Sequence, residues 1–583
     1  MKYSTIPTAQ SLIEHCKAKG LSNIVISPGS RNAPLTISFT EHPYFNCFSI
    51  VDERCAAFFA LGMARQLKEP VAVVCTSGSA LLNYYPAVAE AYYSEVPLVV
   101  ISADRPSYKI DIGDGQTIRQ DDVFKNHIGD AANLKQDVSH ATSTINKYDP
   151  ALLRYKDLDT LQQEVQAYND KQLNRVINSA IQKKLPVHIN VPLEEPLYNV
   201  QEGTGLIPHI EPVQKAKVEK VISKDLLKQW QQAKKKMVLV GGKAPNMIES
   251  EMLKKLANDP SVLVFTETTS NLHHPNFFNS IDSILAPIEL KKDREAYFKN
   301  LQPDILVTMG GLIVSKKIKA FLRDYAPEHH WHVGNTRANN TFFCLEKHFN
   351  VPPNTFLPLL YPDGKATNSD YFSFWDKVKK NYEAKRKSYL NKIPFSDFLV
   401  FDRILKKIPT NYQLHLANSS TIRYTQLFDL DPSLKVFCNR GTSGIDGSTS
   451  TAIGAAVHQQ SPTLLITGDL SFFYDSNALW NNYIRNDFRI ILINNNGGGI
   501  FRILPGKEDT DNFERFFETK HDLNASSLCD MYNIAYSVSS DEDSLLKELS
   551  VFYKASTRPK LLEIQTPRLI NNKILTDYFH FIS

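Results

Sequence analysis

The chain has 583 residues, a formal net charge of +4, 42% hydrophobic residues and 22% charged residues. Because this length exceeds what one hydrophobic core supports, we expect about three or four domains. The nearly balanced charge gives no indication of nucleic acid or a membrane surface as partner, and no apolar run has the length of a membrane span. Seven scattered cysteines without a Cys-x-x-Cys pair, and an amino terminus without a signal-peptide core, favour a cytoplasmic location.

The first region of the chain alternates short apolar runs with stretches of helical spacing. Runs of the first kind predict strands at 23–27, 48–51, 71–75, 97–102 and, closing the region, 187–198. Helices are predicted at 52–67 and at 77–93, the second with Pro86 inside it. Strands that alternate with helices indicate a parallel sheet. We therefore predict an α/β domain over 1–198, followed by a polar linker at 199–220.

Two further regions repeat the alternation. Apolar runs at 237–242, 262–267, 304–311 and 329–334 predict a middle α/β domain over 221–362. After a polar helical stretch at 365–410, runs at 413–418, 435–440, 463–467 and 489–493 predict a last domain over 363–583. The predicted fold class is α/β, with three domains built on mainly parallel sheets.

The last domain carries the most informative polar residues. Asp469 directly follows the predicted strand at 463–467, and Asn494-Asn495-Asn496-Gly497-Gly498 follows the strand at 489–493, with helical spacing over 475–485 between them. This order places a carboxylate and an amide at the carboxyl edge of one sheet, where open α/β sheets bind ligands. Such hard oxygen ligands suit Mg²⁺ together with a diphosphate. The alternative is that Asp469 caps a helix and the Asn/Gly run is a turn.

This pair of motifs resembles the diphosphate-binding signature of thiamine-diphosphate enzymes. The resemblance implies a thiamine-diphosphate-binding fold, in which Asp469, Asn495 and the carbonyl of Gly497 hold Mg²⁺ or Mn²⁺. Leu470 departs from the glycine that is usual at its position, although the ligand atoms remain. Leu470 and Ser471 are expected to approach the diphosphate through the loop after Asp469.

A thiamine-diphosphate enzyme also needs a carboxylate that activates the aminopyrimidine of the cofactor. Glu53 fits this role, because it follows the predicted strand at 48–51. The resemblance implies that this acid serves the active site of the partner subunit, so that the enzyme is a homodimer or a homotetramer. The alternative is that Asp52 and Glu53 only favour the start of a helix.

Further strings narrow the resemblance to one family. They are SPGSRNAPLT (27–36), ADRP (103–106), GQTIRQ (115–120), NSSTIR (418–423), NRGTSGIDGSTST (439–451) and NNNGGGIFRILP (494–505). Together and in this order they resemble the 2-succinyl-5-enolpyruvyl-6-hydroxy-3-cyclohexene-1-carboxylate synthases of menaquinone biosynthesis. The resemblance covers both end domains strongly and the middle domain mainly in its architecture.

The family's substrates, 2-oxoglutarate and isochorismate, carry four carboxylates between them, and arginine binds carboxylates through a planar fork of donors. By resemblance, the substrate site comprises Ser30, Arg31, Arg105, Gln116, Ser419, Arg423 and Arg440, with Ile500, Phe501 and Leu504 on its apolar side. Ser419 is also counted among the residues that bind the cofactor, and Ile445 matches the bulky residue that supports the bent cofactor. Each arginine has the alternative of a weak surface ion pair. Lys316 and Lys317 are weaker candidates for contact with a substrate carboxylate, and Arg119, Arg485 and Arg502 are left unassigned.

The resemblance implies a transferase that decarboxylates 2-oxoglutarate and joins the remaining carbanion to isochorismate by 1,4-addition. One alternative is another thiamine-dependent enzyme, such as a 2-oxo acid decarboxylase or an acetohydroxyacid synthase. A second is a non-catalytic paralogue, against which the joint presence of Glu53, Asp469 and Asn495 argues. A third is a Rossmann oxidoreductase, which is disfavoured because no G-x-G-x-x-G follows the first strand.

Overall fold

The computed structural model describes residues 1–153, 157–213, 222–335, 337–362, 366–503 and 510–583. These residues form two compact units. The first comprises Met1–Ala216, Gly441–Gln460 and Asp475–Arg485, and the second comprises Lys217–Arg440, Ser461–Tyr474 and Asn486–Ser583. Two short segments from late in the sequence therefore pack with the amino-terminal part of the chain. No helix within the described ranges is long and apolar enough to cross a membrane.

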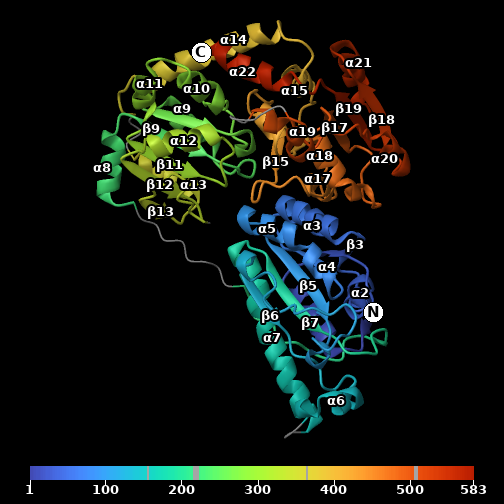
Figure 1. The fold of residues 1–583 in the computed structure, drawn as a ribbon. Coiled ribbons are helices and arrows are strands. Elements are labelled where there is room, and N and C mark those ends of the chain that lie inside the picture. The colour runs from blue at the N-terminus through green and yellow to red at the C-terminus, as the bar shows by residue number, and fades with distance from the viewer. Residues whose placement is uncertain (154–156, 214–221, 336, 363–365, 504–509) are drawn as a thin grey trace. The chain divides into compact units, whose positions relative to one another are not determined.

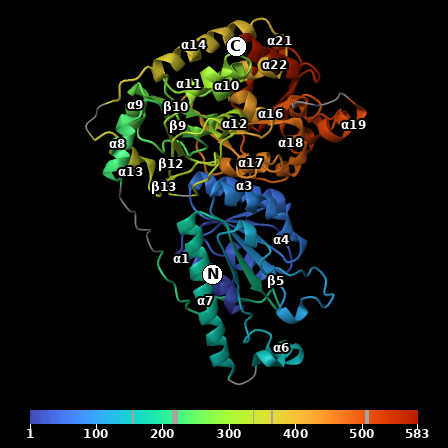
Figure 2. The same cartoon turned by 60° about the vertical axis from the view of Figure 1, so that its left-hand side comes forward.

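The first unit is built on a six-stranded parallel sheet (Figure 1). In sheet order its strands are β3 (Asn46–Ser49), β2 (Asn23–Ile26), β4 (Val71–Cys75), β5 (Leu98–Asp104), β7 (Val187–Pro192) and β6 (Asp130–Asn133). Its helices are α1 (Pro7–Ala18), α2 (Ala33–Thr40), α3 (Glu53–Leu67), α4 (Ser79–Asn83), α5 (Tyr85–Ser94), α6 (Thr142–Tyr148), α7 (Leu158–Lys183) and α17 (Ser448–Ala456). A short antiparallel pair joins β1 (Lys2–Ser4) to β8 (Val200–Glu202). The long helix α7 packs on β6, β7 and α1 (Figure 2).

The crossing of α3 and α17 holds the late segments in the first unit. The backbones of the two helices approach so closely that a Cβ atom on Gly62 would lie 2.1 Å from the carbonyl oxygen of Thr451. On the other helix, a Cβ atom on Gly454 would lie 2.0 Å from the carbonyl oxygen of Phe59. Only glycine permits this approach.

The second unit contains two parallel sheets. The five-stranded sheet runs in the order β10 (Val262–Thr266), β9 (Lys236–Val240), β11 (Ile305–Met309), β12 (His329–Val333) and β13 (Lys347–Phe349). Its helices are α8 (Lys224–Gln232), α9 (Ser250–Asn258), α10 (Ile281–Glu289), α11 (Arg294–Leu301), α12 (Lys316–Asp324) and α13 (Pro353–Phe356), and α14 (Tyr371–Leu390) follows.

The six-stranded sheet of the second unit has the order β15 (Lys435–Cys438), β14 (Gln413–Leu416), β16 (Thr463–Gly468), β17 (Arg489–Asn494), β19 (Lys560–Gln565) and β18 (Ala535–Ser539). Its helices are α15 (Asp397–Leu405), α16 (Ser420–Thr425), α18 (Asp469–Tyr474), α19 (Asp511–Phe513), α20 (Ser526–Met531), α21 (Glu542–Phe552) and α22 (Asn571–Ile582). The central strands β16 and β17 are buried except at Gly468, the last residue of β16, as apolar runs in parallel sheets require. The predicted α/β fold class is confirmed, whereas the exact domain boundaries stay a prediction.

Two predicted helices differ from the structure. The helix predicted over 77–93 is divided into α4 and α5, because Pro86 occupies the first turn of α5. The helical spacing over 475–485 is wrong as a prediction, since only a 3₁₀ turn forms there, at Ser476–Leu479. The side chain of Asn481 instead donates to the carbonyl of Ala478 and accepts from the amide of Tyr483, and such local bonds compete with a helix.

Two buried histidines lie side by side in the five-stranded sheet. His330 Nε2 and His332 Nδ1 are each 3.0 Å from the hydroxyl oxygen of Thr308 on the neighbouring strand. Burial lowers the pKa of each imidazole from 6.5 to about 4. The folded state therefore resists protonation that the unfolded chain accepts.

We expect the second unit to lose stability as the pH falls. The contribution of these neutral imidazoles is fully present above pH 6.5 and is lost as the pH falls through about 4. Urea unfolding measured at neutral pH and at about pH 5 checks this. The double variant His330→Gln/His332→Gln should lose less stability over that step than the wild type, whereas His580→Gln, at an exposed site, should not differ from it. An equal loss in the double variant and the wild type would contradict the assignment.

Candidate active site

The turn after β17 lies beside the residue that ends β16. These strands pair in parallel, with Gly468 opposite Ile493, so Asp469 and the asparagine run meet at one sheet edge. Asp469 is buried, and its carboxylate accepts the amide of Leu470 through Oδ1 at 2.7 Å and the amide of Gly497 through Oδ2 at 2.9 Å. The predicted placement of carboxylate and turn at one sheet edge is therefore present, although the helix expected between them over 475–485 does not form.

The amide of Asn495 is held in one orientation by a residue that the sequence did not suggest. Asn495 Nδ2 donates to Asp397 Oδ2 at 3.0 Å, and the other carboxylate oxygen of Asp397 accepts from Thr566 Oγ1 at 2.6 Å. Since a carboxylate accepts only, the amide nitrogen must face Asp397. Burial raises the pKa of Asp397 to about 6, and the neighbouring charge of Asp469 adds to the rise.

The oxygen of this side-chain amide, Asn495 Oδ1, is suited to bind a metal ion. Asn495 Oδ1 is buried and has no hydrogen-bond partner among the described residues. A buried acceptor without a partner costs about 1–3 kcal/mol, so its presence calls for a ligand. The described part of the chain contains no cluster of three or more His, Cys, Asp or Glu side chains that could hold a metal. The donor set at this turn is instead one carboxylate, one amide oxygen and backbone carbonyls, which suits a hard cation that shares its ligands with a phosphate group.

A basic cluster lies elsewhere in the second unit. Arg440 donates to Asn418 Oδ1 at 2.6 Å, and Arg423 donates to the carbonyl of Ser419 at 2.7 Å. Burial lowers the pKa of Arg423, and the charge of Arg440 lowers it further. Ser419, at φ +68°, is in the left-handed region and places its carbonyl toward that guanidinium. Two of the predicted substrate arginines, Arg423 and Arg440, are therefore close enough for their charges to interact.

Helix α12 contributes a lysine, Lys319, to the surroundings of Arg440. Burial and the charge of Arg440 lower the pKa of Lys319, while the carboxylate of Glu267 opposes the shift. Glu267 is buried and accepts the amides of Val314 and Ser315, which precede α12. Neither residue was found from the sequence, since no motif includes them.

Lys316 and Lys317 differ in their surroundings. Lys317 forms a 2.5 Å ion pair with Glu289, and Lys316 is exposed at the first position of α12. The substrate contact considered for this pair therefore stays a prediction, whereas Lys319 of the same helix lies near the charges of Glu267 and Arg440.

In the first unit, Glu53 is the first residue of α3. Asp52 caps this helix by accepting the amide of Cys55 at 3.1 Å, so the side chain of Glu53 is not needed as the cap. Asn83 Nδ2 donates to Glu53 Oε2 at a distance of 3.4 Å. Glu53 is partly exposed beside the carboxyl end of β3, as the sequence predicted for its position in the chain.

The first unit brings Arg31 and Arg105 close enough for the charge of one to act on the other. Arg31 is buried and donates to the carbonyl of Leu193 and to Glu195 Oε1, each at 3.0 Å. Arg105 donates to Ser77 Oγ at 2.6 Å and to the carbonyl of Gln116 at 2.8 Å. Burial lowers the pKa of Arg105, and the charge of Arg31 lowers it further. The two guanidiniums therefore share a region of positive potential.

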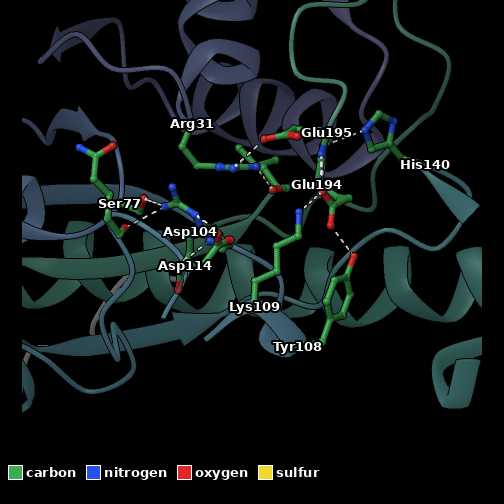
Figure 3. Close-up of polar contacts among 12 residues, drawn as sticks. Arg31, Ser77, Asp104, Tyr108, Lys109, Asp114, His140, Glu194 and Glu195 are labelled. Carbon is green, nitrogen blue, oxygen red and sulfur yellow. Dashed lines mark hydrogen bonds and ion pairs between the residues drawn. The ribbon is translucent and has the colours of Figure 1, made fainter. Parts of the chain in front are cut away.

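Carboxylates surround this arginine pair (Figure 3). Besides Glu195 beside Arg31, Asp114 Oδ2 lies 3.6 Å from Arg105 Nε. Glu194 is buried and accepts from Lys109 Nζ at 2.7 Å and from the hydroxyl of Tyr108. Burial favours a raised pKa for Glu194, but these hydrogen bonds outweigh it and lower the pKa overall. No sequence motif indicated Glu194 and Glu195, which directly follow β7 and its adjoining residue Leu193.

The buried side chain of Gln120 connects the loop at Gly78 with strand β7. Gln120 Oε1 accepts the amide of Gly78 at 2.9 Å, and Gln120 Nε2 donates to Asn190 Oδ1 at 2.7 Å. Asn190 in turn donates to Asp104 Oδ2 at 2.8 Å. Gly78, at φ +82°, would bring a Cβ atom to 3.0 Å from the carbonyl of Gln116, so this loop requires glycine. Gln120 belongs to a predicted string but had no predicted role.

The loop that bears Ile445 is anchored in the first unit by Glu90. This buried carboxylate accepts the amides of Gly441 and Thr442, at 2.9 and 2.7 Å. Ile445 itself is partly buried. The anchoring fixes the start of the loop, whereas the role of Ile445 toward a cofactor stays a prediction.

The remaining predicted residues have simple positions. Ser30 and Gln116 are exposed, Ser471 is buried in α18, and Ile500 and Phe501 are partly buried in a 3₁₀ helix, Gly499–Ile503. Leu504 lies outside the described residues. Arg502, which had no assigned role, is buried and pairs with Glu518.

Comparison with known families gives the class of the protein. Residues 6–131 match the family model "Thiamine pyrophosphate enzyme, N-terminal TPP binding domain". Residues 419–564 match "Thiamine pyrophosphate enzyme, C-terminal TPP binding domain". The first range includes Glu53, and the second includes Asp469 and the asparagine turn after β17. The chain is therefore a thiamine-diphosphate-dependent enzyme.

Curated relatives narrow the class to one family. A 2-succinyl-5-enolpyruvyl-6-hydroxy-3-cyclohexene-1-carboxylate synthase of Christiangramia forsetii is 55% identical and is covered completely, as is this chain. Proteins of the same name from Flavobacterium johnsoniae and Porphyromonas gingivalis are 52% and 35% identical, and the alignments cover at least 98% of each chain. The chain belongs to the family of 2-succinyl-5-enolpyruvyl-6-hydroxy-3-cyclohexene-1-carboxylate synthases, as the resemblance predicted.

Proposed function

We propose that this enzyme decarboxylates 2-oxoglutarate and adds the resulting four-carbon unit to isochorismate by 1,4-addition, as a step of menaquinone biosynthesis. One observation carries the choice of substrates. Two pairs of arginines, Arg31 with Arg105 and Arg423 with Arg440, lie in sequence strings of this family. In each pair the charge of one guanidinium lowers the pKa of the other, so the two side chains are close together. Such pairs suit polycarboxylate substrates. A decarboxylase of simple 2-oxo acids does not require two of them.

The chain's own residues support this chemistry by binding and by placing charge. Bound thiamine diphosphate supplies a nucleophilic carbon and an electron sink for the loss of carbon dioxide. We assign Asp469, Asn495 Oδ1 and the carbonyl of Gly497 as ligands of Mg²⁺ or Mn²⁺, which neutralises the diphosphate. Glu53 is assigned to hydrogen-bond the ring nitrogen of the aminopyrimidine, and Ile445 to support the bent cofactor. The backbone at Leu470 and Ser471 is assigned to the diphosphate, and Ser419 to the cofactor and substrate region.

The substrate carboxylates are assigned to the arginine pairs, with Ser30 and Gln116 as neutral donors. Ile500, Phe501 and Leu504 are assigned to the apolar side of the pocket. Since guanidiniums present fixed forks of donors, they orient the two substrates as well as bind them.

Turnover that requires every component tests the function. With thiamine diphosphate, Mg²⁺, 2-oxoglutarate and isochorismate present, we expect both substrates to be consumed, and omission of any one component should abolish this. Consumption is followed by carbon dioxide release and by the loss of isochorismate. Carbon dioxide release without loss of isochorismate would replace the proposal with the decarboxylase alternative.

Removal of the unpaired amide oxygen tests the metal site. Asn495→Ala should raise the Mg²⁺ concentration required for half-maximal thiamine diphosphate binding at least about tenfold, because even residues that only orient metal ligands contribute that much. Calorimetric titration of the purified protein measures it. Asn486→Ala, at an exposed position in the same unit, is the matched control. Unchanged Mg²⁺ dependence in folded Asn495→Ala protein would remove Asn495 from the ligand set.

Complementation between inactive variants tests the predicted dimer. Glu53→Gln and Asp469→Asn should each abolish turnover, since one removes the activating carboxylate and the other a metal ligand. If Glu53 serves the partner subunit, each hybrid dimer has one intact site. Co-expression of the two variants in equal amounts should then restore about a quarter of the wild-type activity.

The control is Glu69→Gln, an exposed acid after α3, which should keep full activity. No recovery from isolated hybrid dimers would show that each subunit supplies its own Glu53, or that this residue has another role.

A further inference from the structure

A buried carboxylate joins two arginines beside the turn 495–498. We call this turn the diphosphate turn, because it contains the proposed metal ligands Asn495 and Gly497. Glu518 is fully buried at the end of a short π-helix, Glu514–Glu518. Its two oxygens accept from Arg502 Nε and from an Arg502 terminal nitrogen, both at 2.5 Å, and Arg568 donates to Oε2 at the same distance. Arg568 also donates to Glu514 at 3.0 Å. We call Arg502, Glu514, Glu518 and Arg568 the Glu518 cluster.

The backbone around Glu518 holds the turn that contains the proposed metal ligands. The carbonyl of Glu518 accepts the amide of Gly498 at 2.6 Å. Three residues later, the carbonyl of His521 accepts from Asn496 Nδ2 at 3.0 Å. Gly497 lies so close that a Cβ atom there would be 2.8 Å from the Glu518 carbonyl oxygen. The segment 518–521 therefore fixes the conformation of this turn through hydrogen bonds and close backbone packing.

The other end of the cluster holds the predicted apolar side of the substrate pocket. Arg502 belongs to the 3₁₀ helix Gly499–Ile503, which also contains Ile500 and Phe501. The amide of Phe501 donates to the carbonyl of Gly498 at 3.1 Å, so this helix continues directly from the turn. The two hydrogen bonds from Arg502 to Glu518 attach the 3₁₀ helix to the segment 518–521. The same segment also binds the turn through the amide of Gly498. Both groups of proposed ligand-contacting residues are thereby held as one body.

A requirement for stability alone does not explain a charged cluster here. Buried ion pairs are often no more stabilising than well-packed apolar side chains of similar volume. A planar guanidinium bound through two bonds does, however, fix both distance and orientation. Mutation of residues that orient metal ligands typically lowers metal affinity or activity about 10- to 100-fold.

We propose that Glu518 is a positioning residue, which through Arg502 sets the shape of the diphosphate turn and of the adjoining pocket wall. The inference rests on the proposed function for the identity of the ligands, but the geometry of the turn can be tested without them. It assigns a role to Arg502, for which the sequence motif gave none.

Two variants test the proposal in different ways. Glu518→Gln removes the charge between the two arginines, whereas Arg502→Lys keeps the charge and cannot make the two-bond contact. In protein without cofactor, we expect faster amide hydrogen exchange over residues 496–503 in both variants. With Mg²⁺, the dissociation constant for thiamine diphosphate should rise about tenfold or more. At saturating cofactor, kcat should recover toward the wild-type value, while KM for the substrates stays raised.

Glu542→Gln is the matched control, because Glu542 forms a 2.6 Å ion pair with Arg403 at the surface of the same unit. It should change neither exchange over 496–503 nor cofactor affinity. Unaltered exchange and affinity in a folded Glu518→Gln or Arg502→Lys protein would overturn the proposal, even if the melting temperature fell. If Glu518→Gln does not fold, Arg502→Lys decides the matter. Wild-type protein that fails to bind thiamine diphosphate would instead contradict the proposed function, and the exchange measurement would still test the positioning.

Discussion

The buried amide of Asn495 links the architecture of the second unit to its chemistry. Parallel pairing of β16 with β17 brings Asp469 and the asparagine turn to one sheet edge. Asp397 then fixes the amide through its nitrogen, which leaves the oxygen without a partner in the part of the chain that the structure describes. Because an unsatisfied buried acceptor costs about 1–3 kcal/mol, the surrounding contacts must maintain this arrangement. That constraint explains why acids and amides from distant segments converge on one turn.

Carboxylates lie beside the functionally important arginines in both units. The arginines expected to bind substrate have acidic neighbours: Arg31 contacts Glu195, and Arg105 lies near Asp114. Asp114 and Glu195 are largely exposed, whereas Arg31 is buried. Because these two acids face solvent, they can move aside when a substrate carboxylate takes their place beside the arginines. The Glu518 cluster is different, since its central carboxylate is fully buried and fixes geometry.

The sequence predicted the features that short segments encode. Buried apolar runs located the central strands, and the residues after them located Asp469, Asn495 and Arg105 at sheet edges. Family strings supplied roles that no spacing alone could supply. Asp397, Gln120, Glu267 and Glu518 were not found, because each acts through a contact with a segment far away in sequence. The helix predicted over 475–485 failed because local bonds of Asn481 compete with it, and because Asp475 accepts from Ser450 and Arg54 within the first unit. Local spacing cannot show such contacts.

The central claim is that Asp469, Asn495 and Gly497 hold one divalent cation together with the diphosphate. The most direct measurement is the anomalous scattering of Mn²⁺ in crystals grown with thiamine diphosphate. The account predicts a single peak within coordination distance of Asp469, of Asn495 Oδ1 and of the Gly497 carbonyl oxygen, beside the diphosphate. Bound cofactor with no peak at that turn, or with Asn495 Oδ1 hydrogen-bonded to protein instead, would contradict it.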